Sequence, residues 1–213
     1  KTPHTIELYD NSNIQGAYAV AGMVVYKDGV PSKKDYRKYK IKTVEGPDDY
    51  ASMKEVIYRR YYRLLMEQKE MADLIIVDGG LGQIKVAKEV IDGLNLPVHI
   101  CGLSKDDKHS TAMLLDENGN QVPIDTKSPL FFLLTRMQDE VHRYAISFHR
   151  QVRSKSLFSS ILDEVDGIGE ARKKKLLNHF KSVKKMKEAS LEELEAVIPK
   201  NTALKLYEVL HKE

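Results

Sequence analysis

The sequence lacks the features that mark secreted and membrane-spanning proteins. Its 213 residues include a single cysteine, Cys101, which excludes an internal disulfide framework and favours a reducing compartment such as the cytoplasm. No stretch approaches the ~20 apolar residues that cross a bilayer, and the most compact apolar run is PLFFLL at 129–134. We find no signal peptide. The chain begins with Lys1 instead of methionine, so we expect a piece of a longer protein.

The charges are nearly balanced overall but are unevenly distributed along the chain. Of 34 basic and 31 acidic residues in total, 13 basic and 10 acidic ones lie in residues 151–213, so the surplus of positive charge belongs to that part. Such asymmetry indicates an anionic partner for the C-terminal part, although a solvated helix face would give the same composition. Eight cations follow one another there with no acid between them: Arg172, Lys173, Lys174, Lys175, Lys181, Lys184, Lys185 and Lys187.

Residue patterning predicts a mixed α/β domain in the first part of the chain. Three strand-like stretches at 4–10, 16–26 and 35–43, with a turn signal at Asp28-Gly29, predict an antiparallel meander. A strand–helix–strand unit then favours a parallel pairing. This order is that of the ribonuclease H-like fold, a mixed sheet flanked by helices. The later elements are expected as a helix over 50–64 capped by Asp48 or Asp49, a strand within 72–80, a helix over about 82–92, a strand over 96–103, a hairpin over 113–124 and a long helix starting at Ser128-Pro129.

The composition changes after residue 153. Residues 154–158 are rich in Ser and Lys and are typical of a linker, and residues 159–213 contain no strand candidate. We therefore predict a ribonuclease H-like domain over 1–153, a linker over 154–158 and a small all-α domain over 159–213.

Three polar residues are candidates for a metal site. Asp10 ends the first predicted strand and Asp78 ends the fourth, so parallel pairing of these strands would bring both carboxylates to one edge of the sheet. Such a pair can hold Mg²⁺ or Mn²⁺, which prefer oxygen ligands. His142, on a polar flank of the last helix of the domain, can complete the ligand set. Taken singly, each aspartate is equally well explained as a turn former and the histidine as a structural residue.

Two other motifs have simpler interpretations. GGLG at 79–82 follows a strand but matches neither nucleotide-binding glycine pattern, so we interpret it as a tight strand-to-helix turn. DDKH at 106–109 resembles a metal cluster, yet adjacent carboxylates in a polar loop are usually solvated. The neighbouring Lys105 and Lys108 can equally contact a phosphate backbone.

The stretch VDGIGEARKKKLLNHF at 165–180 predicts two helices joined by a tight turn. The glycines let backbone N–H groups face outward at a helix N-terminus, which favours phosphate binding, and the cations that follow attract a nucleic-acid backbone. The pattern resembles a helix-hairpin-helix element, and a glycine-rich helical corner without ligand is the alternative. We assign DNA contacts to Gly167, Ile168, Gly169, Arg172, Lys173 and Lys174, and to His149, Arg150 and Arg153 at the end of the preceding helix.

Taken together, YDNSNIQG, LIIVDGGLGQ, DEVHRYAISFHR and VDGIGEARKKKLL resemble the C-terminal half of UvrC, the nuclease subunit of bacterial excinuclease ABC. The resemblance implies a cytoplasmic endonuclease of nucleotide excision repair and the SOS response that incises damaged double-stranded DNA on the 5′ side of a lesion. It implies a UvrB–DNA complex as partner, bound through a segment outside this chain, and no membrane. It also implies catalytic roles for Asp10, Asp78 and His142, and for a further family aspartate at Asp49.

The predicted second hairpin departs from the family pattern. VIPKNTAL at 197–204 lacks the glycines of the GxG turn, so we expect the first hairpin to make most of the DNA contact, with Lys200 and Asn201 as weak substitutes. A competing reading is a non-catalytic, structure-specific DNA-binding module with a ribonuclease H-like core. A transposase or Holliday-junction resolvase of this fold would carry a carboxylate in place of His142 and no terminal hairpin domain.

Overall fold

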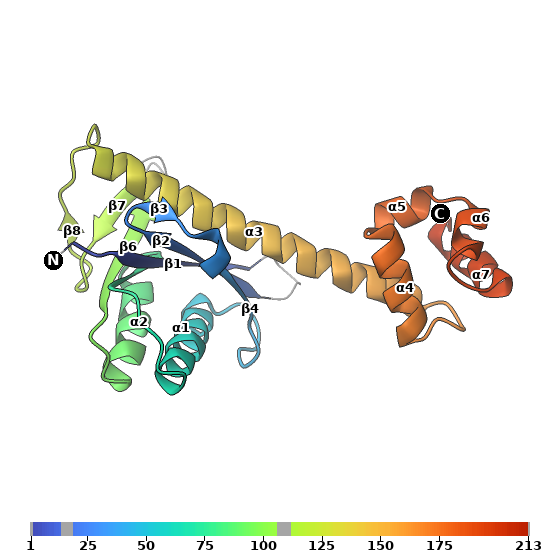
Figure 1. Ribbon diagram of the computed structural model, residues 1–213, viewed down its shortest axis with the longest axis horizontal. Coiled ribbons are helices and arrows are strands. Elements are labelled where there is room, and N and C mark those ends of the chain that lie inside the picture. The colour runs from blue at the N-terminus through green and yellow to red at the C-terminus, as the bar shows by residue number, and fades with distance from the viewer. Residues whose placement is uncertain (1, 14–18, 106–111, 213) are drawn as a thin grey trace. The chain divides into compact units, whose positions relative to one another are not determined.

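The computed structural model describes residues 2–13, 19–105 and 112–212, and the chain divides into two compact units, Lys1–His149 and Arg150–Glu213 (Figure 1). The first unit contains all the strands of the described residues, and the second is helical. None of the helices in the described residues has the length and apolar composition that would let it span a membrane.

The first unit is built on one mixed sheet. Its strands are bonded in the order β3-β2-β1-β5-β6-β7-β8, and β4 also pairs with β2. The pairs β1–β5 and β5–β6 are parallel and the other pairs are antiparallel, which confirms the predicted meander and crossover. The strands are β1 (Thr5–Ser12), β2 (Val20–Lys27), β3 (Val30–Pro31), β4 (Arg37–Lys40), β5 (Leu74–Asp78), β6 (His99–Lys105), β7 (Ala112–Leu115) and β8 (Gln121–Val122).

Helices cover both faces of this sheet. Helices α1 (Asp49–Met66) and α2 (Leu81–Gly93) lie on one face, and α3 (Pro129–Asp163) crosses the other (Figure 1). The Asp48 carboxylate accepts a hydrogen bond of 2.9 Å from the Ala51 N–H, so Asp48 is the N-cap of α1. A short 3-10 helix, η1 (Lys33–Asp35), precedes β4.

The core of the first unit has two layers, one on each face of the central strands. On the α1 side, Met53 and Ile57 are completely buried, and on the α3 side Met137 and Val141 are buried. Because both faces of β1 and β5 are covered, these strands carry apolar residues at successive positions and not only at alternate ones. This two-sided burial holds the central strands rigidly beneath α3.

The second unit is a bundle of short helices around its own core. The capping box Ser190–Glu193 starts one of them. The core contains Ile168, Leu176 and Leu206, which come from different parts of the unit. The helices are α4 (Glu170–Phe180), α5 (Val183–Glu188), α6 (Leu191–Glu195) and α7 (Lys200–Leu210), together with the C-terminal end of α3.

The segment predicted as a linker has a different structure. Residues 154–158 lie inside α3 and are helical. The reason is that Phe158 and Leu162, one helical turn apart, are both buried in the core of the second unit. Their burial stabilises a helix through the Ser- and Lys-rich stretch, whose Ser154 and Lys155 remain exposed.

Candidate functional site

Two aspartates meet at the carboxyl-terminal edge of the parallel strands β1 and β5. The register pairs Tyr9 with Val77, so the residues that follow, Asp10 and Asp78, lie side by side. Both side chains point to the α3 face, where each has a partner on that helix. Asp10 is buried and Asp78 is half-buried. The predicted juxtaposition of the two carboxylates is therefore present in the structure.

His142 reaches this pair from helix α3. Its Nδ1 lies 3.0 Å from Oδ2 of Asp10, and 58% of its side chain remains exposed. One edge of the ring is thus held by the aspartate while the ring stays open to solvent. The open part can take a ligand or exchange a proton with one.

A glycine in the sheet allows α3 to come this close. Gly22 on β2 is the register partner of Asp10, and a Cβ built on it would lie 3.0 Å from the backbone nitrogen of Ala145. Any larger residue would meet the helix backbone, so α3 packs directly on the sheet beside Asp10. Since Ala145 follows His142 by less than one helical turn, this contact fixes the height of the histidine over the carboxylates.

Gln138 fixes the second aspartate. Its Nε2 donates a hydrogen bond of 2.9 Å to Oδ1 of Asp78, and the residue is only 4% exposed. Gln138 stands one helical turn before His142 on the same flank of α3, so one helix contacts both carboxylates. The sequence places Gln138 on this flank but gives it no role. The position of Gln138 four residues before His142 is the feature of the sequence that indicates such a role.

The electrostatics of the pair favour a bound cation. Burial and the neighbouring carboxylate of Asp78 together raise the pKa of Asp10 to about 7, although His142 acts in the opposite direction. Burial also raises the pKa of Asp78, while the hydrogen bond from Gln138 opposes this. Two carboxylates forced together out of water repel each other when both are ionised. A divalent cation bound by the two carboxylates would remove that cost.

The donor set and its geometry fit such an ion. One ligand atom from each of Asp10, Asp78 and His142 lies within 4.8 Å of the other two. Two carboxylate oxygens suit Mg²⁺ or Mn²⁺, and an imidazole nitrogen is a common ligand of transition-metal ions. In the described residues this is the one such group of three His, Cys, Asp or Glu side chains.

Asp49 is placed differently from the other three. It begins α1, and its carboxylate accepts a hydrogen bond of 2.5 Å from Nδ2 of Asn13. Its main-chain oxygen accepts one of 2.8 Å from Nδ2 of Asn11, the residue after Asp10. Asp49 is thus tied to the end of β1 but does not belong to the group of three potential ligands.

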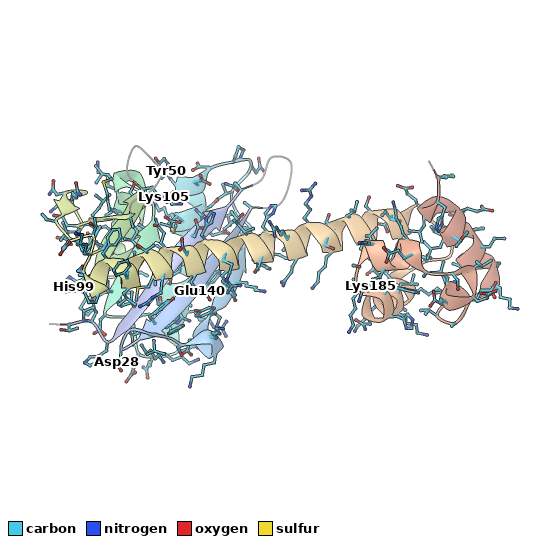
Figure 2. The ribbon with its side chains drawn as sticks, turned by 90° about the horizontal axis from the view of Figure 1, so that it is seen from above. Asp28, Tyr50, His99, Lys105, Glu140 and Lys185 are labelled. Atoms are coloured by element: carbon cyan, nitrogen blue, oxygen red, sulfur yellow. The ribbon has the colours of Figure 1, made fainter. Side chains whose placement is uncertain are left out.

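The structure describes only some of the residues in the two loop motifs, DDKH at 106–109 with its neighbouring lysines and GGLG at 79–82. The DDKH motif and Lys108 lie outside the described residues, whereas Lys105 ends β6 at the same edge of the unit as Tyr50 (Figure 2). The charge of Lys105 lowers the pKa of Asp78, against the larger effect of burial. GGLG forms the tight turn that we predict, with Gly79 at φ 158° and Gly80 as the N-cap of α2.

The predicted first hairpin has the expected turn. Gly167 adopts φ 92°, in the left-handed region that favours glycine, and Gly169 is the N-cap of α4. Ile168 between them is buried in the core of the second unit, so it anchors the turn and leaves the flanking backbone exposed. Nη1 of Arg172 donates to the main-chain oxygen of Gly167 over 2.5 Å, which ties the first turn of α4 to the hairpin.

The other residues predicted to contact DNA differ in how exposed their side chains are and in whether their charges are compensated by ion pairs. Lys174, Arg150 and Arg153 are exposed. Lys173 instead forms ion pairs with Asp163 and Glu170, so its charge is largely compensated within the unit. His149 is 1% exposed, which leaves almost none of it for a ligand. The sequence could not reveal these two outcomes, because they depend on partners and burial in the folded chain.

Comparison with known families decides the identity of the chain. Residues 1–146 match the family model of the UvrC RNase H endonuclease domain. The chain belongs to the UvrC family. Residues 159–212 match the model of the SAM-like helix-hairpin-helix tandem. The resemblance and the order of the two domains inferred from the sequence are therefore confirmed.

Solved structures similar to this UvrC chain include other nucleases. Endonuclease V from Ciona intestinalis, in complex with a 24mer DNA containing an inosine followed by a ribo-adenosine, is 17% identical and has a TM-score of 0.35, over 48% of this chain and 46% of that one. Human endonuclease V is 14% identical with a TM-score of 0.34, over 63% and 54%. Clostridium butyricum Argonaute bound to a guide DNA and a target DNA is 15% identical with a TM-score of 0.33, over 58% and 17%. The UvrC chain spans about half the length of the two endonuclease V chains.

The second hairpin of this UvrC chain lies against the first. A Cβ on Gly167 would lie 3.3 Å from Oγ1 of Thr202, and the two turns line one hollow of about 430 Å³ that also includes Arg172 and Lys205. Lys200 and Asn201 begin α7 and are exposed. The two turns thus present a joint surface in which only the first contains glycine.

Proposed function

We propose that this chain is a divalent-metal-dependent DNA endonuclease of nucleotide excision repair that hydrolyses a phosphodiester on the 5′ side of a lesion. The observation that carries the proposal is the convergence of Asp10, Asp78 and His142 within 4.8 Å, in a domain that matches the UvrC endonuclease family. Damaged double-stranded DNA, presented by a UvrB–DNA complex in the bacterial cytoplasm, is the proposed substrate. The helix-hairpin-helix tandem is proposed to grip its backbone.

The residues of the site have separable roles in this mechanism. Asp10 and Asp78 would hold Mg²⁺ or Mn²⁺, with His142 completing the ligand set. The ion supplies activation of the attacking water and neutralises charge on the phosphoryl group. Gln138 keeps the Asp78 carboxylate oriented through its amide. If His142 is not a ligand, its exposed ring can move a proton near the scissile phosphate, while Asp10 fixes its orientation. The expected products carry a 3′-hydroxyl and a 5′-phosphate.

Removal and return of the metal tests the proposal. A duplex with one lesion and a label at the 5′ end of the damaged strand is incubated with UvrB and with this chain joined to the UvrB-binding segment that the resemblance places outside it, after treatment with EDTA, and then with Mg²⁺ or Mn²⁺. We expect no product in EDTA, and a single nick 5′ of the lesion with at least one of the two ions. Equal nicking in EDTA would refute metal dependence. Binding of the duplex without any nick under all conditions would favour the non-catalytic DNA-binding module.

The hairpin turns give a prediction for DNA affinity. In the variant Gly167→Ala/Gly169→Ala, the change at Gly167 forces a side chain onto a backbone at φ 92° and toward Thr202, whereas the change at Gly169 adds a methyl group to the exposed turn; we expect a loss of about tenfold in duplex affinity, or ~1.4 kcal/mol. Lys200→Ala with Asn201→Ala should change affinity by less than threefold. Fluorescence anisotropy with a labelled duplex measures both variants.

Two controls make this comparison decisive. Thermal unfolding monitored by circular dichroism shows whether the glycine variant remains folded, and Lys174→Ala removes an exposed charge beside the turn without altering its backbone. Our assignment is wrong if the glycine variant binds DNA normally while changes at residues 200–202 abolish binding.

A further inference from the structure

A second charged hollow lies in the first unit, on the face of the sheet opposite the aspartate pair. Side chains alternate along β1, so Asp10 points to α3 whereas Glu7 contacts α1 through Arg60 and Tyr61. The hollow has a volume of about 590 Å³ and is bounded by β1, β2, β4 and the C-terminal half of α1. Seven cationic and four acidic side chains line it, so its lining has net positive charge.

The floor of the hollow is a buried and internally neutral network. Glu7 is 2% exposed, and its Oε1 accepts from Nη2 of Arg60 at 2.7 Å and from Nε at 3.2 Å. Its Oε2 accepts from the hydroxyls of Tyr9 at 2.6 Å and Tyr61 at 2.8 Å. The carboxylate raises the pKa of Arg60, although burial alone would lower it. This network holds the floor rigid and leaves its charge compensated.

At the rim, Lys27 is paired with Asp35, whereas the guanidinium groups of Arg37 and Arg59 have neutral partners. Arg59 donates to the main-chain oxygen of Lys40 at 2.8 Å and lies over the ring of Tyr39. Arg37 donates to two main-chain oxygens, at 2.8 and 3.1 Å. These contacts orient both guanidinium groups without neutralising them.

Further along α1 the charges of the lining are balanced. Arg63 and Lys69 share the carboxylate of Glu67, and Glu70 lies in the same part of the lining. The positive charge of the rim is therefore carried mainly by Arg37 and Arg59, whose oriented guanidinium donors suit anionic oxygens.

Exposed aromatic rings lie on the same helix, outside the lining of the hollow. Tyr58 and Tyr62 are 47% and 45% exposed, and their rings stack with centroids 5.4 Å apart and an interplanar angle of 19°. Each directly precedes an arginine of the hollow, Arg59 or Arg63, so the stacked pair lies on the neighbouring exposed side of α1. Exposed rings beside oriented arginines are the arrangement by which proteins bind single-stranded nucleic acid, with bases on the rings and phosphates on the cations.

We propose that this surface, formed by Arg37, Tyr58, Arg59, Tyr62 and Arg63, binds a single-stranded segment of nucleic acid. The phosphates contact Arg37 and Arg59 at the rim, and bases stack on Tyr58 and Tyr62. The inference rests on the proposed function only in taking nucleic acid as the ligand. It goes beyond that function because the surface is on the other face of the sheet from Asp10 and needs no metal. Free phosphate shares the rim chemistry, but the rings give it no benefit.

Salt dependence of binding tests the rim. A labelled (dT)16 oligonucleotide is titrated with the full chain at several salt concentrations, comparing Arg37→Gln/Arg59→Gln with a matched control, Lys85→Gln/Lys127→Gln, which removes two exposed cations outside the hollow. Glutamine keeps a donor for the main-chain oxygens. Loss of two phosphate contacts should lower the slope of log K against log salt by about 1.4 and the affinity by about tenfold. The control should change neither.

Photo-cross-linking locates the contact and separates it from binding by the second unit. The same oligonucleotide carrying 5-iodouracil should cross-link to peptides containing Tyr58 or Tyr62, and Tyr58→Leu/Tyr62→Leu should remove those cross-links and lower affinity about fivefold or more. Excess inorganic phosphate should compete only weakly. Asp10→Asn should retain the cross-links, so failure of incision and failure of this inference are distinguishable.

Two results would overturn the inference. One is cross-linking confined to residues 150–213 with an unchanged salt slope in the arginine variant. The other is displacement of the oligonucleotide by a polyglutamate peptide that binds with the same affinity, while the tyrosine substitutions change the affinity for neither ligand. The second result would make the surface a docking site for an acidic protein segment.

Discussion

Asparagine in place of Asp10 or Asp78 should reduce incision by at least about 10³-fold while leaving DNA affinity unchanged. Each substitution preserves size and hydrogen bonding but removes one of two adjacent negative charges that would hold the cation. A metal ion contributes several kcal/mol to stabilising a phosphoryl transition state, and ~4 kcal/mol corresponds to about 10³ in rate. Single-turnover incision of the lesion-bearing duplex, with anisotropy for binding, measures the two effects separately.

A matched control is available on the surface of the same unit. Asp92 on α2 is exposed and forms only a 3.5 Å ion pair with Lys88 one helical turn away, so Asp92→Asn should keep full activity. A double variant, Asp10→Asn/Asp78→Asn, should be no less folded than the wild type. Incision by the purified double variant at more than a few per cent of the wild-type rate would show that the reaction occurs elsewhere.

The metal-free protein should become less stable as the pH rises from 4 to 7. In the folded chain Asp10 titrates at about 7, because of burial and the Asp78 charge, whereas the ordinary aspartate value of 3.8 applies when unfolded. Between these values the folded state holds a proton that the unfolded state has lost, so each increase in pH favours unfolding. Since one pKa unit corresponds to 1.36 kcal/mol, the full effect is about 4 kcal/mol and is complete about one unit above pH 7.

Comparison with Asp10→Asn isolates this effect from other titrations. The variant carries no charge at position 10, so in EDTA at pH 8 it should be about 4 kcal/mol more stable than the wild type, and at pH 4 nearly equally stable. Urea unfolding at both pH values in EDTA measures the difference. Mn²⁺ should stabilise the wild type at pH 8 and have little effect on the variant. A wild-type protein that is the more stable of the two at pH 8 would contradict the assigned repulsion.

Much of the fold was predictable because it follows from local patterning. The switch from alternating to helical periodicity locates most elements, and the strand–helix–strand unit implies parallel pairing. Parallel pairing alone places Asp10 beside Asp78, since both end their strands at one edge. The side chain of His142 could be placed on a flank of its helix in the same way. These are properties that a few neighbouring residues determine.

What the sequence could not reveal depends on contacts between distant residues. Residues 154–158 are helical because Phe158 and Leu162 are buried in the second unit. The local composition, rich in Ser and Lys, gives no indication of this helix. Likewise, the polar side chain of His149 predicts an exposed position, yet the folded chain buries it. The partners of Lys173 are equally a product of the tertiary structure.

Gly22 would influence the size of the ion that the proposed metal site accepts. The two carboxylates belong to the sheet and the imidazole belongs to α3, so the gap between the layers sets the space available to an ion. That gap is limited by the contact of Gly22 with Ala145, beside Asp10 and less than one helical turn from His142. Discrimination between a small ion such as Mg²⁺ and a larger one such as Ca²⁺ depends on cavity size and flexibility. In the proposed metal site, this discrimination would therefore depend partly on a residue outside the ligand set.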